Sequence, residues 1–228
     1  MNVGVLFSGG KDSCYALFKA MQEKESMVVC LISIISRNPE SFMFHTPNIW
    51  VTELQAQAIG LPLVKQETAG VKEEELKDLK KAIEKAKKKF KLEGIVTGAI
   101  ESVYQSQRIQ KICSELNLKC INPLWKKSQK QLLEELLENN FKVIISGIFA
   151  FPLNEKWLGR ELDEWTVKEL VGLQEKFKLS PSGEGGEIET TVLDTPFFKK
   201  RIEVIESEIK VKHNSGVFII KKARLKEK

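Results

Sequence analysis

The chain has 228 residues, of which 42% are hydrophobic and 29% charged, and a formal net charge of +5. A chain of this length can remove roughly 70 to 75% of its unfolded surface from water, enough for one large domain or two modest ones, and no apolar run approaches the roughly 20 residues that cross a bilayer, which excludes a membrane protein. Lysines are interleaved with glutamates between Lys72 and Lys91, which does not favour a nucleic-acid partner, and the first residues lack a basic leader and a cleavage site, so we expect a cytoplasmic protein.

The first half of the chain alternates short strand-like runs with helical patterns, which predicts a parallel sheet with crossover helices. We expect five strands, over Val3–Phe7, Met27–Ile35, Leu61–Glu67, Gly94–Gly98 and Leu118–Ile121. Apolar residues spaced for one helical face predict helices over about Lys11–Glu23, Pro47–Ala58 and Ser102–Leu116, and a long charged helix whose apolar stripe is Leu76, Leu79, Ile83, Ala86 and Phe90. The predicted fold class is therefore α/β.

Beyond Pro123 the alternation loosens, and we expect a smaller α+β domain. Its predicted elements are a helix near Gln129–Glu138, a strand at Phe141–Phe149, a helix near Asp163–Lys178 and a hairpin of Ile202–Lys212 with Val217–Ala223. We place the boundary so that residues 1–123 form the first domain and residues 124–228 the second.

A glycine loop follows the first predicted strand, directly before the first helix. In an open α/β sheet, ligands bind beyond the carboxyl ends of the strands. Two glycines let backbone N–H groups approach an oxyanion closely, and the N-terminus of a helix attracts it. The candidate phosphate site is therefore the loop of Ser8, Gly9, Gly10, Lys11, Asp12 and Ser13.

Lys11 and Asp12 give this loop its chemistry. Lys11 can neutralise phosphate charge, whereas Asp12 would repel phosphate unless a Mg²⁺ ion lies between them, so Asp12 is the candidate metal contact for a Mg²⁺-bound nucleotide. One helix terminus contributes roughly 0.3 to 2 kcal/mol toward an anion, and micromolar affinity needs about 8 kcal/mol. A nucleoside pocket must supply the rest, and the topology places that pocket near Ser33 and Gly98.

The simplest alternative is a tight turn between a strand and a helix, because Ser, Gly and Asp are ordinary capping residues. A lysine directly after two glycines and before Asp-Ser disfavours that alternative. The loop is also not a Walker motif, which needs four residues between its first glycine and Gly-Lys-Ser/Thr. Transfer of the γ-phosphate is therefore disfavoured as well.

The segment from Ser8 to Ser13 resembles the Ser-Gly-Gly-x-Asp-Ser loop of the PP-loop ATP pyrophosphatases, which implies a Rossmann-like HUP domain with a five-stranded sheet that binds ATP. Within that superfamily nearly the whole chain resembles the diphthine-ammonia ligase family. Val103 and Ser106 depart from the family pattern, which has an acidic and a basic residue there. The resemblance rests on Gly98-Ala99-Ile100, Tyr104-Gln105, Arg108, Pro123-Leu124-Trp125, the run from Leu158 to Asp163, and Gly183-Glu184-Gly185-Gly186-Glu187 with Glu189-Thr190.

The resemblance implies the amidation of diphthine to diphthamide on elongation factor 2. A carboxylate is a poor acyl donor, so the reaction would pass through an acyl-adenylate, with AMP and pyrophosphate as products. Lys11 and Asp12 are the catalytic candidates, since positioning and electrostatics can supply the acceleration without a protein nucleophile. The two domains account for the whole chain and leave no room for a glutaminase, so we expect free ammonium as the nitrogen source. A homodimer is compatible with this interpretation.

The segment from Ser182 to Thr190 is the second candidate site. From spacing alone, a flexible turn that enters a strand with Glu187, Glu189 and Thr191 facing water is slightly favoured. The resemblance reverses this preference, because it implies carboxylates that face the nucleotide and attract the quaternary ammonium of diphthine or the ammonium ion. The candidate substrate contacts are Glu184, Gly185, Gly186, Glu187 and Glu189, together with Tyr104, Gln105 and Arg108.

Two other functions stay open. A PP-loop enzyme that adenylates a tRNA base normally relies on a reactive cysteine pair and a strong RNA-binding patch, whereas the four cysteines here are scattered and read as buried free thiols. A nucleotide-binding protein without catalysis is the more distant alternative, because fold does not settle function. Lys11 with Asp12 argues against it. We expect His45 to be a surface histidine on a loop.

Overall fold

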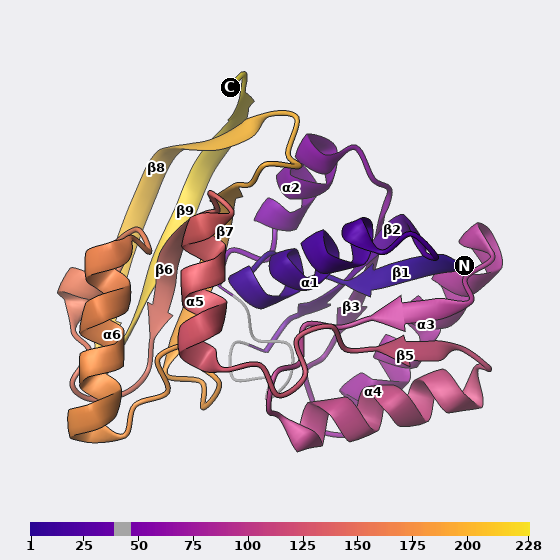
Figure 1. Ribbon diagram of the computed structural model, residues 1–228, viewed down its shortest axis with the longest axis horizontal. Helices are drawn as coiled ribbons and strands as arrows, with labels where there is room; N and C mark the ends of the chain where they lie inside the picture. Colours follow the sequence, from indigo (N-terminus) through magenta and orange to yellow (C-terminus); the bar gives the residue numbers. More distant parts are fainter. Residues whose placement is uncertain (39–46) are drawn as a thin grey trace.

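The computed structural model describes residues 1–38 and 47–228, so His45 lies outside the described residues. The first half of the chain forms a parallel five-stranded sheet in the order β3-β2-β1-β4-β5 (Figure 1). Its strands are β1 (Asn2–Leu6), β2 (Met27–Ser36), β3 (Leu63–Thr68), β4 (Gly94–Val96) and β5 (Lys119–Ile121). This sheet confirms the predicted α/β class.

Helices cover both faces of this sheet. Successive side chains of a strand point to opposite faces, so Leu31 of β2 packs in one core with helices α1 (Lys11–Gln22) and α2 (Val51–Ile59). Its neighbours Cys30 and Ile32 pack in a second core with α3 (Glu75–Phe90) and α4 (Val103–Glu115). The strand order reverses between β1 and β4, and such a reversal is where open α/β sheets bind ligands.

The second half forms an antiparallel sheet in the order β7-β6-β9-β8. Helices α5 and α6 lie together in front of this sheet (Figure 1). This part confirms the predicted smaller α+β unit. Its elements are α5 (Gln129–Glu138), β6 (Lys142–Ile148), a 3-10 helix η1 (Glu155–Trp157), α6 (Glu164–Phe177), β7 (Ile188–Asp194), β8 (Arg201–Lys212) and β9 (Ser215–Lys226).

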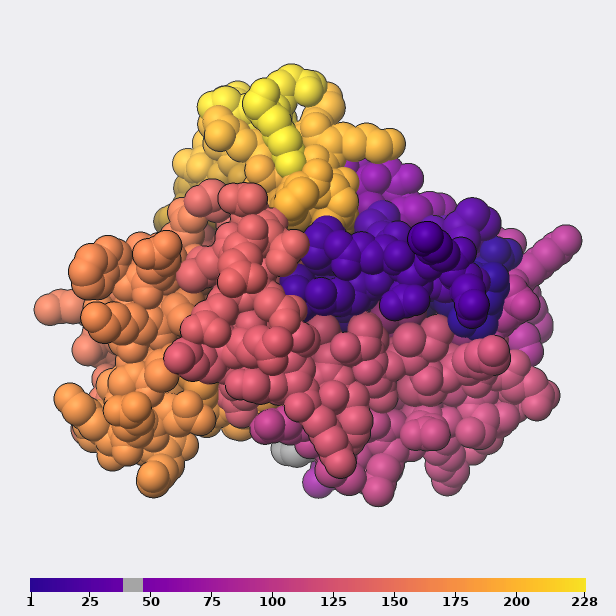
Figure 2. Space-filling model, in the orientation of Figure 1, coloured from indigo at the N-terminus to yellow at the C-terminus, as the bar shows by residue number. Residues whose placement is uncertain are grey.

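One hydrophobic core joins the two sheets. Phe18 of α1 packs against Phe141, which precedes β6, with ring centroids 5.6 Å apart, and against Phe197, which follows β7, at 5.9 Å. In the space-filling view the indigo N-terminal segment lies between the pink middle of the chain and its orange and yellow end (Figure 2). The domain boundary near residue 123 stays a prediction, since the two halves share this core.

The largest difference from the predicted elements is the start of α2, which begins at Val51 rather than near Pro47. Asn48 has a φ of 64°, in the left-handed region that a right-handed helix cannot contain. Its side chain is held by β9, because Asn48 Nδ2 donates to the Phe218 carbonyl at 2.9 Å and Asn48 Oδ1 accepts from the Ile220 N–H at 2.7 Å. These tertiary hydrogen bonds override the local helical pattern.

The cysteines follow the prediction. Cys14, Cys30 and Cys113 are buried, Cys120 is half-buried, and all four are free thiols. Across the described residues, the helices are too short or too polar to span a bilayer.

Candidate nucleotide and substrate site

The loop Ser8–Gly10 follows β1 and leads directly into α1. Gly9 has a φ of 78°, and a Cβ at this position would lie 2.3 Å from Gln55 Oε1, so the loop requires glycine there. Gly10 is the N-cap residue of α1 in an extended conformation and has no side chain to cap the helix. The first turn of α1 therefore directs N–H groups and the positive end of its dipole toward the space beyond β1.

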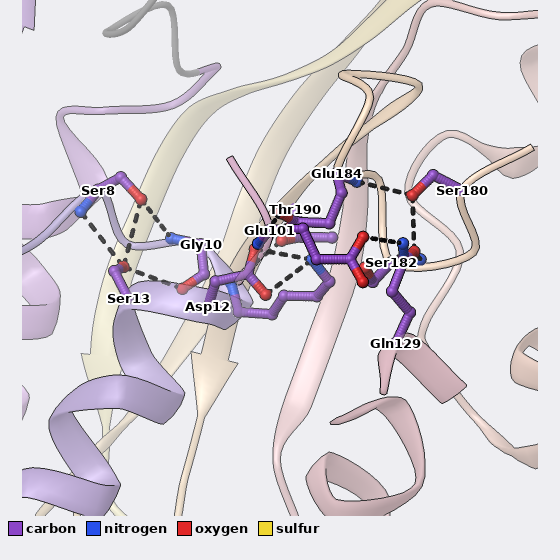
Figure 3. A network of polar contacts seen from close by, with 11 residues as sticks. Ser8, Gly10, Asp12, Ser13, Glu101, Gln129, Ser180, Ser182, Glu184 and Thr190 are labelled. Carbon is purple, nitrogen blue, oxygen red and sulfur yellow. Dashed lines mark hydrogen bonds and ion pairs between the residues drawn. The ribbon is translucent and has the colours of Figure 1, made fainter. Parts of the chain in front are cut away.

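Two serine hydroxyls close the loop on itself (Figure 3). Ser13 Oγ accepts from the Ser8 N–H at 3.3 Å, lies 3.2 Å from Ser8 Oγ and donates to the Gly10 carbonyl at 3.1 Å. Ser8 Oγ accepts from the Gly10 N–H at 3.4 Å. These long contacts leave both hydroxyls able to turn toward an anion, because hydroxyl hydrogen bonds are strongest near 2.7 to 2.8 Å.

Lys11 and Asp12 form an ion pair at the edge of the loop. Lys11 Nζ lies 3.0 Å from Asp12 Oδ1 and 2.8 Å from Oδ2. The lysine side chain is only 3% exposed, whereas the aspartate is 30% exposed. A buried lysine needs a negative partner. Asp12 is that partner here, and a phosphate group could take its place.

The loop forms one wall of a cavity of about 770 Å³, which is within the size range of small-molecule sites. A second wall is apolar and comes from β1, β2, α3 and α4, with Leu6, Ile32, Ile34, Leu79 and Ile109. The third wall belongs to the second sheet and to the turn before β7, with Ser182 to Gly186 and Ile188 to Thr190. The cavity therefore joins an anion-binding loop, an apolar pocket and a carboxylate-bearing turn.

Most of the predicted site residues line this cavity, namely Ser8, Gly10, Lys11, Asp12, Ser13, Gly98, Gln105, Glu184, Gly185, Gly186 and Glu189. The structure places the other predicted residues outside its walls: Gly9, Ser33, Tyr104, Arg108 and Glu187.

Ser33 is buried on the opposite face of β2 from the cavity. Its hydroxyl donates to the Phe7 carbonyl at 2.5 Å, while Ile32 and Ile34 on either side line the cavity. Side chains alternate along a strand, so the cavity uses the neighbours of Ser33 and not Ser33 itself. Ser33 instead braces the end of β1 just before the glycine loop.

Tyr104 and Arg108 form a surface cluster on α4. The Arg108 guanidinium carbon lies 3.4 Å from the centroid of the Tyr104 ring, and Arg108 Nη2 donates to Glu73 Oε1 at 2.6 Å. The Tyr104 hydroxyl donates to the same Glu73 oxygen at 2.9 Å. Tyr104 and Arg108 therefore both bind the loop before α3. Of the three residues predicted on this helix, Gln105 lines the cavity.

Two carboxyl groups opposite the loop have unusual proton affinities. Burial, reinforced by the charge of Asp12, raises the pKa of Glu184 to about 7, and Lys11 opposes this rise. Burial also raises the pKa of Glu189 to about 7, again with Lys11 opposing and Asp12 reinforcing. Both carboxyl-bearing residues line the same cavity as Lys11 and Asp12, so they share this space with the glycine loop.

The arrangement that spacing alone slightly favours, with Glu187, Glu189 and Thr191 on a water-facing strand surface, is wrong. Thr191 is 3% exposed, and Glu189 lines the cavity. Glu187 precedes β7, and its carboxylate accepts from the Ser180 N–H at 3.0 Å. This hydrogen bond joins the two ends of the turn.

The sequence did not reveal two residues that hold the loop. Thr190 Oγ1 accepts from the Lys11 N–H at 3.1 Å. Gln55 Nε2 donates to the Gly9 carbonyl at 2.9 Å and to the Val192 carbonyl at 2.8 Å. Strand β7 thus buttresses the glycine loop from the second sheet. Thr190 lies in the Glu189-Thr190 segment that contributes to the family resemblance, so the resemblance could have indicated it. The local sequence around Gln55 gives no such signal.

The sheet order, the glycine loop after β1 and the cavity above it define a nucleotide-binding α/β protein of the Rossmann-like type. Two family models match the chain and leave only a short connection between them. Residues 1–120 match the diphthamide synthase N-terminal domain and residues 128–225 the diphthamide synthase C-terminal domain. The chain therefore belongs to the diphthamide synthase family, and the resemblance seen in the sequence is confirmed.

Named relatives agree with this family. A diphthine–ammonia ligase of Schizosaccharomyces pombe is 35% identical over 100% of this chain, which spans 40% of that protein's length. Diphthine–ammonia ligases of Bos taurus and Homo sapiens are each 34% identical over 96% of this chain and 88% of their own length. Among solved structures, a predicted subunit of a tRNA methyltransferase from Methanocaldococcus jannaschii has 20% identity and a TM-score of 0.43, covering 86% of this chain and 98% of that one.

Proposed function

We propose that this chain is an ATP-dependent ligase that converts diphthine to diphthamide on elongation factor 2, with ammonium as the nitrogen donor and AMP and pyrophosphate as products. One observation carries the proposal: a single cavity holds the glycine loop on one wall and two half-buried glutamates with raised pKa values, Glu184 and Glu189, on another. Family membership supports it. A cytoplasmic location goes with the proposal, since the substrate is a translation factor.

The residues of the loop bind and neutralise the group that leaves. In the proposed reaction the diphthine carboxylate attacks the α-phosphorus of ATP, the bond to the β-phosphate breaks, and pyrophosphate departs as the acyl-adenylate forms. The N–H groups of the first turn of α1, the Ser8 and Ser13 hydroxyls and the Lys11 ammonium would stabilise the departing charge. Ammonia then attacks the acyl carbon and AMP leaves. The apolar wall, near Ile32 and Gly98, would receive the adenosine.

The residues present fit a Mg²⁺ ion brought by the nucleotide. Within residues 1–38 and 47–228, no group of three or more His, Cys, Asp or Glu side chains could form a metal cage. Mg²⁺ usually binds through one or two carboxylates, substrate phosphates and water, so a cage is not needed. Asp12, partly exposed at the cavity, would hold the ion, which supplies charge neutralisation for the phosphates when bound.

The opposite wall would recognise the acceptor. Glu184 and Glu189 carry negative charge above pH 7, which suits the quaternary ammonium of diphthine or the incoming ammonium ion. Replacing Glu184 with Gln keeps the shape and removes the charge, so we expect a higher KM for modified elongation factor 2. Glu189→Gln tests the same assignment, because Glu189 also lines the cavity. This acceptor role would be rejected if the KM for the modified factor were unchanged in both variants.

The products of ATP decide between the functions. AMP and pyrophosphate should form when ATP and ammonium are incubated with elongation factor 2 that bears diphthine, and not with unmodified factor. The same assay with tRNA as acceptor tests the tRNA-adenylating alternative, and absence of turnover with tight ATP binding would indicate a non-catalytic protein. ADP as the sole product would reject the adenylation mechanism.

A homodimer is also proposed, through the outer edge of β8, which pairs with no further strand among the described residues. Ile209 and Val211 on this strand are 48% and 46% exposed, and sheet edges pair readily with one another. In an antiparallel pairing centred on Ile209, Glu208 would face Lys210 of the partner subunit. Light scattering after size exclusion should give twice the chain mass of 25.9 kDa, and Glu208→Lys should reduce it to one chain. A single-chain mass for the unmodified protein would refute the dimer.

A further inference from the structure

Gln129, the first residue of α5, lies between the two halves of the site and contacts both (Figure 3). Its Oε1 accepts from Ser180 Oγ at 2.6 Å, from Ser182 Oγ at 2.9 Å and from the Ser182 N–H at 3.2 Å. Its Nε2 donates to Glu101 Oε2 at 3.1 Å. Glu101 follows β4 of the first sheet, whereas both serines belong to the turn before β7.

The contacts of Gln129 close into a ring. The Glu101 N–H donates to Glu184 Oε2 at 3.2 Å. The Glu184 N–H donates to Ser180 Oγ at 3.1 Å, and Ser180 Oγ donates back to Gln129. Glu184 is thus the only member of this ring whose carboxyl group also lines the cavity.

We propose that Gln129 is the positioning residue for Glu184: it sets where the carboxylate stands relative to the phosphate loop. This inference rests on the proposed function, since it names the residue that places an acceptor contact. Only a group that both donates and accepts can bridge the Glu101 carboxylate and the serine donors, and a carboxamide does so without charge.

The residues around Glu184 and Gln129 are consistent with a positioning role for Gln129. Gly183 and Gly186, before and after Glu184, have φ values of 79° and 83°, in the left-handed region that glycine adopts without a steric penalty. The start of α5 does not need Gln129 as a cap, because Ser128 is the N-cap residue and accepts from the Gln131 N–H. Three of the four hydrogen bonds of Gln129 therefore hold the turn, and the fourth joins it to Glu101.

Gln129→Glu is the sharpest test, because it keeps the shape and all acceptor capacity but places two carboxylates against each other at the Glu101 contact. Gln129→Glu removes the hydrogen bond to the charged Glu101 carboxylate, and hydrogen bonds to charged groups are the stronger ones. We therefore expect the KM for diphthine-bearing elongation factor 2 to rise about 10- to 100-fold. The KM for ATP should change less than about twofold, since Gln129 does not line the cavity. Gln131→Glu is the matched control, with the same charge change two residues along α5.

A second substitution restores the contact. Glu101→Gln alone should be nearly silent, because its amide oxygen still accepts from Gln129 Nε2. Combined with Gln129→Glu, it reverses the direction of the hydrogen bond and should return the acceptor KM to within about threefold of the unmodified protein, as expected for a directly coupled pair. This double variant also keeps the test usable if Gln129→Glu alone folds poorly.

Hydrogen exchange separates failure of this inference from failure of the proposed function. The backbone N–H groups of Ser180 and Glu184 donate within this turn, and that of Ser182 donates to Gln129 Oε1. Gln129→Glu should therefore speed their exchange, and the double variant should slow it again. If exchange responds in this way but no acceptor is turned over by any variant, the ring stands and the proposed function fails. An unchanged acceptor KM in Gln129→Glu, or a double variant no better than the single one, overturns the positioning role.

Discussion

Gly98→Ala should damage the phosphate loop although the side chain grows by one methyl group. A Cβ at Gly98 would lie 2.8 Å from the Asp12 carbonyl carbon and 2.9 Å from the Ser13 nitrogen. Comfortable contacts lie at about 3.5 to 4.0 Å, so backbone must move by roughly 0.6 to 1.2 Å. Both contacts are backbone at the start of α1, which cannot turn away as a side chain would. Overpacking of this kind costs about 1 to 3 kcal/mol.

Two measurements follow from this displacement. The midpoint of thermal unfolding should fall by about 2 to 12 °C, since 1 kcal/mol corresponds to about 2 to 4 °C in a chain of this size. Turnover should fall by up to about 100-fold, the usual effect of a misplacement near 1 Å. Gly172→Ala in α6 is the control, because nothing lies within 4 Å of its Cβ; it should stabilise the helix by about 0.5 to 1 kcal/mol without affecting ATP. ATP affinity and turnover within twofold of the unmodified protein in Gly98→Ala would refute the reasoning.

Three further predictions concern the support of the site. Thr190→Val removes the acceptor for the Lys11 N–H and should cost about 1 to 3 kcal/mol in chemical denaturation, with weaker ATP binding by calorimetry; unchanged ATP affinity would contradict the buttress. Glu189 has a folded pKa of about 7 against an ordinary 4.5, so its contribution to stability is present below pH 4.5 and lost as the pH rises to 7; Glu189→Gln should reduce the pH dependence of the melting temperature of the nucleotide-free protein across that window, and Glu184, whose pKa is also about 7, should account for the remainder. Asp163→Ala removes the cap that accepts from the Thr166 N–H at 2.7 Å and should cost about 0.5 to 2 kcal/mol, while ATP affinity stays the same.

The glycine loop could be predicted because its determinants are local. A strand, two glycines and an apolar helical stripe lie within the first 23 residues, and strand order then places the loop at the carboxyl edge of the sheet. The supports of the loop are not local. Gln55 and Thr190 reach it from 46 and 179 residues away in the chain, and only the folded arrangement shows which polar side chain meets which backbone group.

The sequence also did not predict which face of β2 lines the cavity. This strand is apolar on both faces, so its alternation does not tell which side chains meet a ligand. Ser33 was a candidate because the topology places the nucleoside pocket beside the end of this strand, yet its hydroxyl donates to the Phe7 carbonyl. In a strand buried on both sides, a lone polar residue can satisfy the backbone of a neighbour, and the apolar residues beside it line the pocket.

The charges of the cavity make a final prediction. Lys11 lowers the pKa values of Glu184 and Glu189, and Asp12 raises them. Lys11→Met should therefore move both pKa values above about 7, whereas Asp12→Asn should move both below it, as carboxyl NMR titration without nucleotide or divalent ions would show. Shifts in the same direction in the two variants would mean that the loop and the carboxylates do not face each other. Opposite shifts would explain why the cavity suits a nucleotide together with a cation: three carboxyl groups against one lysine repel a bare triphosphate, and an added positive charge relieves that repulsion, so each ligand should strengthen the binding of the other.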